Sequence, residues 1–278
     1  MNPLLRRSWF DRAVMAALTL LALVWMAPLL WVLALSFKPN EFLLTHTDVF
    51  LAPPYTLANY RDILQTSQVF RWLGNSALVA GLQTVGVLVL SSLAGYGFAR
   101  CEFPGRKWLF ALVMFGLAVP AQSVFIPLHR LFSDWNLQNT VAGLALPGLA
   151  APFGVYLMTQ YFKAIPAELE EAALLDNASR FKTFLTIILP LTLPAQATLG
   201  IFTFLGCWND YLWPLVIATQ PDMYTLTRGL ASTQTNFAQS EGLGFLMAQA
   251  VFAGMPALML YLFFQRHLVT AVAGTGKS

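Results

Sequence analysis

Six long apolar segments, separated by shorter polar stretches, dominate the chain. Each is about 20 residues long or slightly more, which is enough for an α-helix to cross the hydrocarbon core of a bilayer. Lipid offers backbone groups no hydrogen-bond partners, so only helices or closed barrels span it, and the alternating strands of a barrel are absent. The pattern predicts an all-α integral membrane protein, with one transmembrane domain over 1–278. Its six transmembrane helices are expected at about 14–35, 73–98, 108–131, 141–162, 184–205 and 243–264.

The composition agrees with this pattern. The chain is 57% hydrophobic and 10% charged, whereas a soluble domain carries about 25% charged residues. The few basic residues are used in loops and give no indication of nucleic-acid binding. The first apolar run follows Arg6, Arg7 and Arg12 as in a signal peptide, but it is longer than the apolar part of one. We therefore interpret it as an uncleaved first span.

The basic residues are distributed unevenly between the two sides. With the N-terminus inside, eleven of the sixteen Lys and Arg residues fall on the inner side and five on the outer side. The positive-inside rule then places both termini, and the loop at 163–183, in the cytoplasm. The outer segments at 37–72 and 206–242 are long enough to meet a partner, although they could also be plain connections. Leu57–Leu64 is expected to form a short amphipathic helix at the membrane interface.

No arrangement for covalent chemistry or metal binding is visible in the sequence, so we expect no catalytic residues and no metal site. Cys101 and Cys207 fall on opposite sides of the predicted membrane, too far apart for a disulfide. The C-terminal AVAGTGKS resembles a phosphate-binding loop, but Ala271 replaces the first glycine and a membrane helix precedes it instead of a strand. The chain is thus expected to bind no nucleotide or other cofactor of its own.

The spans lack a charged residue near their middle, where ion-driven carriers usually have one. Their polar residues are neutral, Gln83 among them, and they could either line a translocation path or join helices by hydrogen bonds. A polar pair follows the fifth span and could border an outer gate or simply begin a loop. The path candidates from these two groups are Asn75, Gln122, Asn209, Asp210 and Gln249.

The loop at 163–183 predicts a short helix lying across the membrane face. Three glutamates at 168–171 place negative charge at its start, which favours the helix dipole. Ala172 and Ala173 keep one face narrow, so that another surface can approach closely. Asn177 is expected to end the helix in a left-handed conformation, which Asn tolerates better than most residues. Such a helix either docks another protein or is an ordinary connection. Pro190 and Pro194 are expected to bend or loosen the helix of the fifth span, which follows the loop.

These residues resemble the inner-loop signature of ABC importer permeases, written EAA, three residues, Gly, nine residues, Ile, one residue, Leu-Pro. The chain has Glu171-Ala172-Ala173, and Asn177 takes the glycine position as the one departure from the signature. Ile187, Leu189 and Pro190 follow in register. Flanking stretches such as GYGFARCEFPGRK and FLGCWNDYLWPL are similar to the carbohydrate-type branch, which includes the maltose permease component.

The resemblance implies the type I importer permease architecture, with a coupling helix between spans four and five, in the bacterial inner membrane. It implies a second, non-identical permease subunit, an ATPase dimer that holds ATP and Mg, and a periplasmic or surface solute-binding protein. The substrate is expected to be a sugar or a sugar-like solute such as a polyol, a uronic-acid oligomer or glycerol phosphate. The ATPase-coupling residues implied are Glu170, Glu171, Ala172, Ala173, Asp176, Asn177, Ile187, Leu189 and Pro190.

Two other functions are compatible with a six-span protein. An ATP-independent secondary carrier or channel predicts uptake without ATP, and it usually carries the intramembrane charge that the spans lack. A structural or assembly subunit predicts no transport. ATP-dependent uptake and co-purification with an ATPase would separate the three functions.

Overall fold

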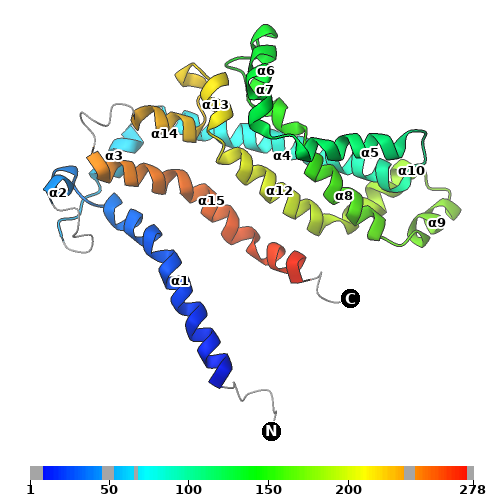
Figure 1. The fold of residues 1–278 in the computed structure, drawn as a ribbon, viewed down its shortest axis with the longest axis horizontal. Helices are drawn as coiled ribbons and strands as arrows, with labels where there is room; N and C mark the ends of the chain where they lie inside the picture. The colour runs from blue at the N-terminus through cyan, green and yellow to red at the C-terminus, as the bar shows by residue number, and fades with distance from the viewer. Residues whose placement is uncertain (1–8, 46–52, 66–67, 235–241, 274–278) are drawn as a thin grey trace. The chain divides into compact units, whose positions relative to one another are not determined.

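The computed structural model describes residues 9–45, 53–65, 68–234 and 242–273. Within these ranges the regular elements are all helices, which confirms the all-α prediction (Figure 1). The α-helices are α1 (Trp9–Ser36), α2 (Asn40–Thr45), α3 (Ala58–Gln65), α4 (Val69–Arg100), α5 (Arg106–Phe115), α6 (Ala121–Asp134), α7 (Val141–Ala145), α8 (Pro152–Ala164), α9 (Glu168–Leu175), α10 (Arg180–Thr183), α11 (Leu189–Leu191), α12 (Leu193–Trp208), α13 (Leu212–Ile217), α14 (Leu226–Gln234) and α15 (Gly242–Ala273). Short helical turns η2 (Gly116–Ala118), η3 (Leu146–Leu149), η4 (Phe184–Ile188) and η5 (Pro221–Met223) complete them.

The spans are of two kinds. The helices α1, α4 and α15 are each long and apolar enough to cross a membrane unbroken. Three more spans arise if each of three bent helix pairs is one crossing. The pairs are Arg106–Ala118 with Gln122–Asp134 at 103°, Val141–Leu149 with Pro152–Ala164 at 48°, and Arg180–Leu191 with Leu193–Trp208 at 75°. The total of up to six agrees with the number of spans predicted from the sequence.

Prolines explain the breaks, although the sequence predicts a bend only in the fifth span. A residue that precedes proline is pushed out of the helical region, and proline itself donates no backbone hydrogen bond. Val119, before Pro120, is extended at φ −80° and ψ 116°. Ala151, before Pro152, has left the helical region at φ −114° and ψ 78°. Segments 108–131 and 141–162 are therefore bent helix pairs rather than single helices.

The bend of the fifth span is held by hydrogen bonds. Its first part closes a π-turn, in which the N–H of Leu189 bonds to the carbonyl of Phe184. The Leu189 carbonyl then accepts from Thr192 N at 3.1 Å, from Thr192 Oγ1 at 2.8 Å and from Gln196 Nε2 at 2.8 Å. Polar side chains thus satisfy the backbone at the bend, as membrane helices interrupted by Pro190 and Pro194 require.

The described residues group into two compact units. The terminal unit comprises the described residues 9–45, 53–65, 230–234 and 242–255, and the central unit comprises 68–229 and 256–273. In the terminal unit, Asn59 of α3 donates to the carbonyls of Ser36 and Lys38, both at 2.9 Å. Asn40 donates to Asn59 Oδ1 at 3.3 Å and accepts from the N–H of Phe245 at 3.2 Å. This network holds the end of α1, the predicted short helix α3 and the start of α15 together.

The core of the central unit lies where α4 meets α8 and the fifth span. Its buried cluster consists of Val87, Met158, Phe162, Phe184, Ile188, Ala195 and Leu199. Small residues let α4 and α8 approach closely, as in many membrane helix pairs. A Cβ atom at Gly95 would lie 2.7 Å from Met158 Cβ, and one at Gly154 would lie 2.4 Å from Ser91 Oγ. This close contact fixes α4 and α8, which hold the loop at 163–183.

Candidate functional site

The loop at 163–183 contains the predicted short helix, α9. Ala167 caps its start, and the carbonyl of Ala167 accepts from the N–H groups of Glu170 at 2.9 Å and Glu171 at 3.1 Å. The first turn carries three glutamates, Glu168, Glu170 and Glu171. Negative side chains next to free backbone N–H groups stabilise this end of the helix.

The end of α9 forms at Asn177, as the sequence predicts. Asn177 has φ 56°, in the left-handed region. Its N–H bonds to the carbonyl of Leu174 at 3.0 Å, and the N–H of Ala178 bonds to the carbonyl of Ala173 at 3.0 Å. These two bonds define a Schellman motif, the usual glycine-containing end of a helix. Asn177 therefore takes the left-handed conformation for which glycine is usually chosen at the end of a helix.

This geometry predicts a difference between two substitutions. Asn177→Gly should leave the loop unchanged, whereas Asn177→Val should destabilise the helix end by about 1–2 kcal/mol, because a β-branched residue is strained at positive φ. Limited proteolysis with trypsin at Arg180 and Lys182 measures the effect. We expect cleavage about 5- to 30-fold faster in Asn177→Val and within about twofold of the parent in Asn177→Gly. Equal rates in all three proteins would contradict the motif.

The two adjacent glutamates of the loop face different surroundings. Glu170 Oε1 lies 3.2 Å from Arg100 Nε, and both side chains are largely buried, at 19% and 16% exposure. The Arg100 guanidinium also donates to the carbonyl of Ile165. Glu171, one position further along α9, is exposed. Glu170 thus fastens the loop to the end of α4, and Glu171 is directed outward.

The two alanines of the motif are divided in the same way. Ala172 is exposed, but Ala173 is only 6% exposed. The prediction that both form the face that packs against a partner is therefore wrong for Ala173, because neighbouring helix positions point in different directions. Apolar side chains extend the outward side, with Leu174 49%, Leu175 84% and Phe181 64% exposed. We call Glu171, Ala172, Leu174, Leu175, Asp176 and Phe181 the exposed loop surface.

The last positions of the motif lie away from this surface. Ile187 and Leu189 pack against the buried cluster of the central unit. Pro190 stands at the start of the bend, in α11. Between them and the loop, the ring of Phe184 lies 4.7 Å from that of Tyr96 on α4. The motif therefore combines an exposed surface with residues that join it to the core.

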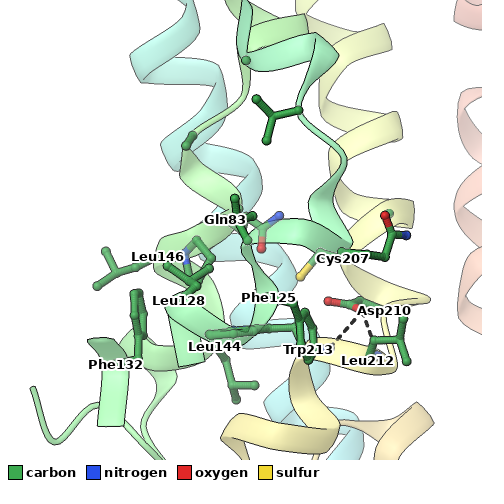
Figure 2. A pocket seen from close by; sticks show the side chains of 18 of the residues that line it. Gln83, Phe125, Leu128, Phe132, Leu144, Leu146, Cys207, Asp210, Leu212 and Trp213 are labelled. Atoms are coloured by element: carbon green, nitrogen blue, oxygen red, sulfur yellow. Dashed lines mark hydrogen bonds between the residues drawn. The ribbon is translucent and has the colours of Figure 1, made fainter. Parts of the chain in front are cut away.

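A second feature of the central unit is a cavity of 920 Å³, shown in Figure 2. It forms beside the breaks of the third and fourth spans. Its walls come from α4, from α6 and the break before it, from α7 and η3, from the break before α8, and from the segment between the end of α12 and the start of α13. Aromatic residues contribute to the lining, and the rings of Phe125 and Phe132 lie edge to face with Trp213 at 5.6 Å and 5.5 Å.

Three polar side chains with amide or carboxylate groups line this cavity: Gln83, Gln122 and Asp210. Asp210 Oδ1 accepts from the N–H groups of Leu212 at 3.1 Å and Trp213 at 3.4 Å. Burial raises the pKa of the Asp210 carboxyl, although backbone hydrogen bonds from Trp213, Leu212 and Tyr211 oppose the shift. Figure 2 shows the side chains of Gln83 and Asp210 turned toward a common space that Cys207 borders.

Of the five path candidates, the structure brings Gln122 and Asp210 together in this cavity. Gln83, which belongs to the neutral polar residues that the sequence offers for a path, lines it as well, and so does Cys207, which the sequence does not indicate. In the sequence, nothing distinguishes Gln83 from a polar residue that joins two helices. The only sequence signal for the cavity is the prolines at the helix breaks beside it, such as Pro120 and Pro152.

The other three candidates lie elsewhere. Asn75 Nδ2 donates to the backbone carbonyls of Asp222 and Tyr224, both at 2.9 Å, and so fastens a segment after α13 to α4. The exposed Asn209 donates to the carbonyl one turn earlier in α12, at 2.8 Å. Gln249 is buried, at 2% exposure, on the part of α15 that belongs to the terminal unit.

The remaining expectations from the sequence concern the thiols, metal binding and the stretch that resembles a phosphate-binding loop. Cys101 and Cys207 are both free thiols. Among the described residues, His, Cys, Asp and Glu form no group of three or more that could hold a metal ion. The stretch that resembles a phosphate-binding loop falls largely outside the described residues, since residues 274–278 are not among them.

Comparison with known proteins places the chain among transport proteins. The family model described as binding-protein-dependent transport system inner membrane component matches residues 87–274. The arabinooligosaccharides transport system permease protein AraQ of Halalkalibacterium halodurans is 33% identical, over 92% of this chain and 92% of its own. The diacetylchitobiose uptake system permease protein NgcG of Streptomyces coelicolor is 31% identical, over 93% and 86%. A crystal structure of a bacterial ABC transporter that imports the acidic polysaccharide alginate has the same fold, with TM-score 0.78, 21% identity and coverage of 93% and 98%.

Proposed function

Because the chain belongs to the family of binding-protein-dependent transport system inner membrane components, we propose that its loop at 163–183 is the point where ATP hydrolysis is coupled to transport. The chain is a permease subunit of an ABC importer of the carbohydrate type, with several membrane-spanning helices. In this proposal the residues of the loop have two different roles. The exposed loop surface docks the ATPase, and the buried residues of the loop transmit the movement of the ATPase to the rest of the chain.

The observation that carries this proposal is that α9 is anchored to α4 on one side and exposes acidic and apolar side chains on the other. Glu170 is paired with Arg100 at 3.2 Å, and Ala173 is buried, so α9 has little freedom to move separately from α4. Glu171 remains exposed beside Leu174 and Leu175. Exposed apolar side chains rimmed by charge are typical of a protein interaction site. We infer that Glu171 pairs with a basic residue of the ATPase and that the leucines fill its cleft.

The proposed assembly supplies the nucleotide-binding site and the second half of the pathway, which this chain is not expected to contain. Two ATPase subunits bind ATP and Mg on the cytoplasmic side, and a second, non-identical permease completes the pathway. A solute-binding protein outside the membrane delivers the solute. In this arrangement the chain lies in the bacterial inner membrane, with both termini and the loop at 163–183 in the cytoplasm, in agreement with its eleven inner and five outer basic residues.

The proposed solute is a sugar or a sugar-like compound. Its support is the names of two relatives with at least 30% identity, which transport arabinooligosaccharides and diacetylchitobiose. ATP has to bind one global state of the assembly better than the other in order to drive a conformational change. A loop that is fixed to α4 and α8 is a suitable lever, because a displacement of α9 moves both helices.

The test is reconstitution of the importer with the ATPase, partner permease and binding protein encoded by neighbouring reading frames. We expect uptake of labelled oligosaccharide into vesicles only with ATP and the binding protein, and no uptake with a non-hydrolysable ATP analogue. Uptake that persists without ATP would favour a secondary carrier and refute the proposal. Failure of this chain to co-purify with any ATPase would refute the coupling role as well.

A further inference from the structure

The amides in the 920 Å³ cavity are available to a ligand. Neither Gln83 nor Gln122 makes a side-chain hydrogen bond within the part of the chain that the structure describes, and both line the cavity. The position of Gln83 depends on Gly148, because a Cβ atom there would lie 2.1 Å from Gln83 Nε2. The absence of a side chain at Gly148 therefore leaves room for the Gln83 amide at the cavity wall. Each amide offers both donors and an acceptor.

The carboxylate of Asp210 is held in one orientation by hydrogen bonds, and it can accept further hydrogen bonds. The backbone hydrogen bonds from Leu212 at 3.1 Å and Trp213 at 3.4 Å both end on Oδ1. Oδ2 is left to accept from a ligand in the cavity. A carboxylate held by backbone N–H groups at the start of α13 does not need to rotate before it receives a hydroxyl group. That is the arrangement expected of a positioned acceptor for hydroxyl groups.

The charge of the cavity limits what it can hold. Its described lining contains the Asp210 carboxyl and no Lys, Arg or His. A ligand with a carboxylate or phosphate group would meet a like charge at short range with no cation to compensate, which is unfavourable where water is partly excluded. Hydroxyl groups would instead find one charged acceptor and two amides. The rest of the lining is largely apolar and includes Phe125, Phe132 and Trp213, and the volume is in the range of ligand sites of about 300–1,000 Å³.

We propose that this cavity is a binding station for an uncharged, polyhydroxylated solute, in which Gln83, Gln122 and Asp210 contact the hydroxyl groups and Asp210 excludes anionic sugars. The inference rests on the proposed function and adds two statements to it. Part of the solute path lies within this chain, and the solute class is neutral rather than acidic. Uronic-acid oligomers and glycerol phosphate are thereby removed from the solutes expected from the sequence.

The free thiol of Cys207 lines the same cavity and reports its occupancy. The experiment uses the assembled importer in nanodiscs with Cys101→Ser in this chain. Labelling of Cys207 by N-ethylmaleimide is followed at pH 9, where more of the thiol is ionised, both without nucleotide and with a non-hydrolysable ATP analogue. The neutral probes are glucose, mannitol, trehalose and maltotriose, and the anionic probe is trigalacturonate, matched in size to maltotriose. We expect at least one neutral probe to slow labelling fivefold or more, and trigalacturonate to change it less than twofold.

Variants make the inference specific. Asp210→Asn keeps the shape and the acceptor for the backbone bonds but removes the charge, so trigalacturonate should now slow labelling by threefold or more. Gln83→Leu should abolish protection by the neutral probe. Asn209→Ala is the matched control, because Asn209 is adjacent but does not line the cavity, and it should behave as the parent protein.

Several outcomes would overturn the station. They are equal protection by neutral and anionic probes, no protection by any neutral probe, and no labelling of Cys207 in either nucleotide state, since a station must be reached by its solute. ATP-dependent uptake measured on the same preparation separates the two proposals. Coupled uptake without protection of Cys207 refutes the station and leaves the proposed function standing. Protection together with ATP-independent uptake refutes the coupling role and leaves the station standing.

Discussion

Glu171→Lys is expected to lower ATP-driven uptake by about 100-fold, while the permease still inserts and the ATPase subunits retain basal hydrolysis. Glu171 is exposed on the loop surface next to Leu174 and Leu175. Reversing its charge opposite a basic residue places like charges in contact, which costs several kcal/mol in a protein interface. Since each 1.4 kcal/mol is a factor of ten in affinity, loss of this contact is enough to release the ATPase or leave it uncoupled.

The measurement compares uptake and ATP hydrolysis in the same vesicles, together with the amount of ATPase that co-purifies. Glu168→Lys is the matched control, because Glu168 is also exposed and lies in the first turn of α9, but outside the three-residue EAA core. It should retain uptake within about threefold. Normal coupled transport by Glu171→Lys would remove the docking role from this residue. An equal loss in both variants would indicate a general effect of charge on the loop.

A second comparison within the loop separates docking from anchoring. Glu170 is tied to Arg100 in the chain itself, so Glu170→Gln weakens the attachment of α9 to α4 rather than the contact with a partner. The two glutamates are adjacent in the sequence, and both belong to the coupling residues that the resemblance implies. Only the orientation of α9 about its own axis distinguishes them, because it turns Glu170 toward α4 and Glu171 away from it. That orientation depends on Arg100, which is far away in the sequence.

The sequence predicts those features that depend on local chemistry. The long apolar helices α1, α4 and α15 follow from segment length alone. The left-handed end of α9 follows from Asn177, and the bend of the fifth span from Pro190 and Pro194, since each residue restricts its own backbone.

Features that depend on contacts between distant segments follow from the sequence only in part or not at all. The sequence favours Ala173 as part of the docking side, whereas the structure buries it, because the buried side of a short helix is set by the residues beneath it. The cavity combines residues of α4, α6, η3 and the start of α13. Its polar residues come from segments without any common pattern, and Gln83 differs in no visible way from a polar residue that joins two helices. Only the prolines at the breaks give a local indication of its place.

The contact between α4 and α8 is a point where one added carbon should have a large effect on stability. A Cβ atom at Gly95 would lie 2.7 Å from Met158 Cβ and 3.0 Å from the backbone nitrogen of Thr159. The backbone of α8 cannot rotate away as a side chain can, so the two helices have to separate. Overpacking of this kind costs about 1–3 kcal/mol, and we expect Gly95→Ala to lower the unfolding temperature of the detergent-solubilised importer by about 3–10 °C.

Gly97 provides the control on the same helix. A Cβ atom there meets nothing within 4 Å, so Gly97→Ala should be neutral or stabilising by up to about 1 kcal/mol, because alanine favours a helix more than glycine does. Equal unfolding temperatures for the two variants would contradict the close approach of α4 and α8. The contact also bears on coupling, since Arg100 stands at the end of α4 and holds Glu170. If α4 is the lever, uptake per ATP hydrolysed should fall in Gly95→Ala even in the fraction of importer that remains folded, and stay unchanged in Gly97→Ala.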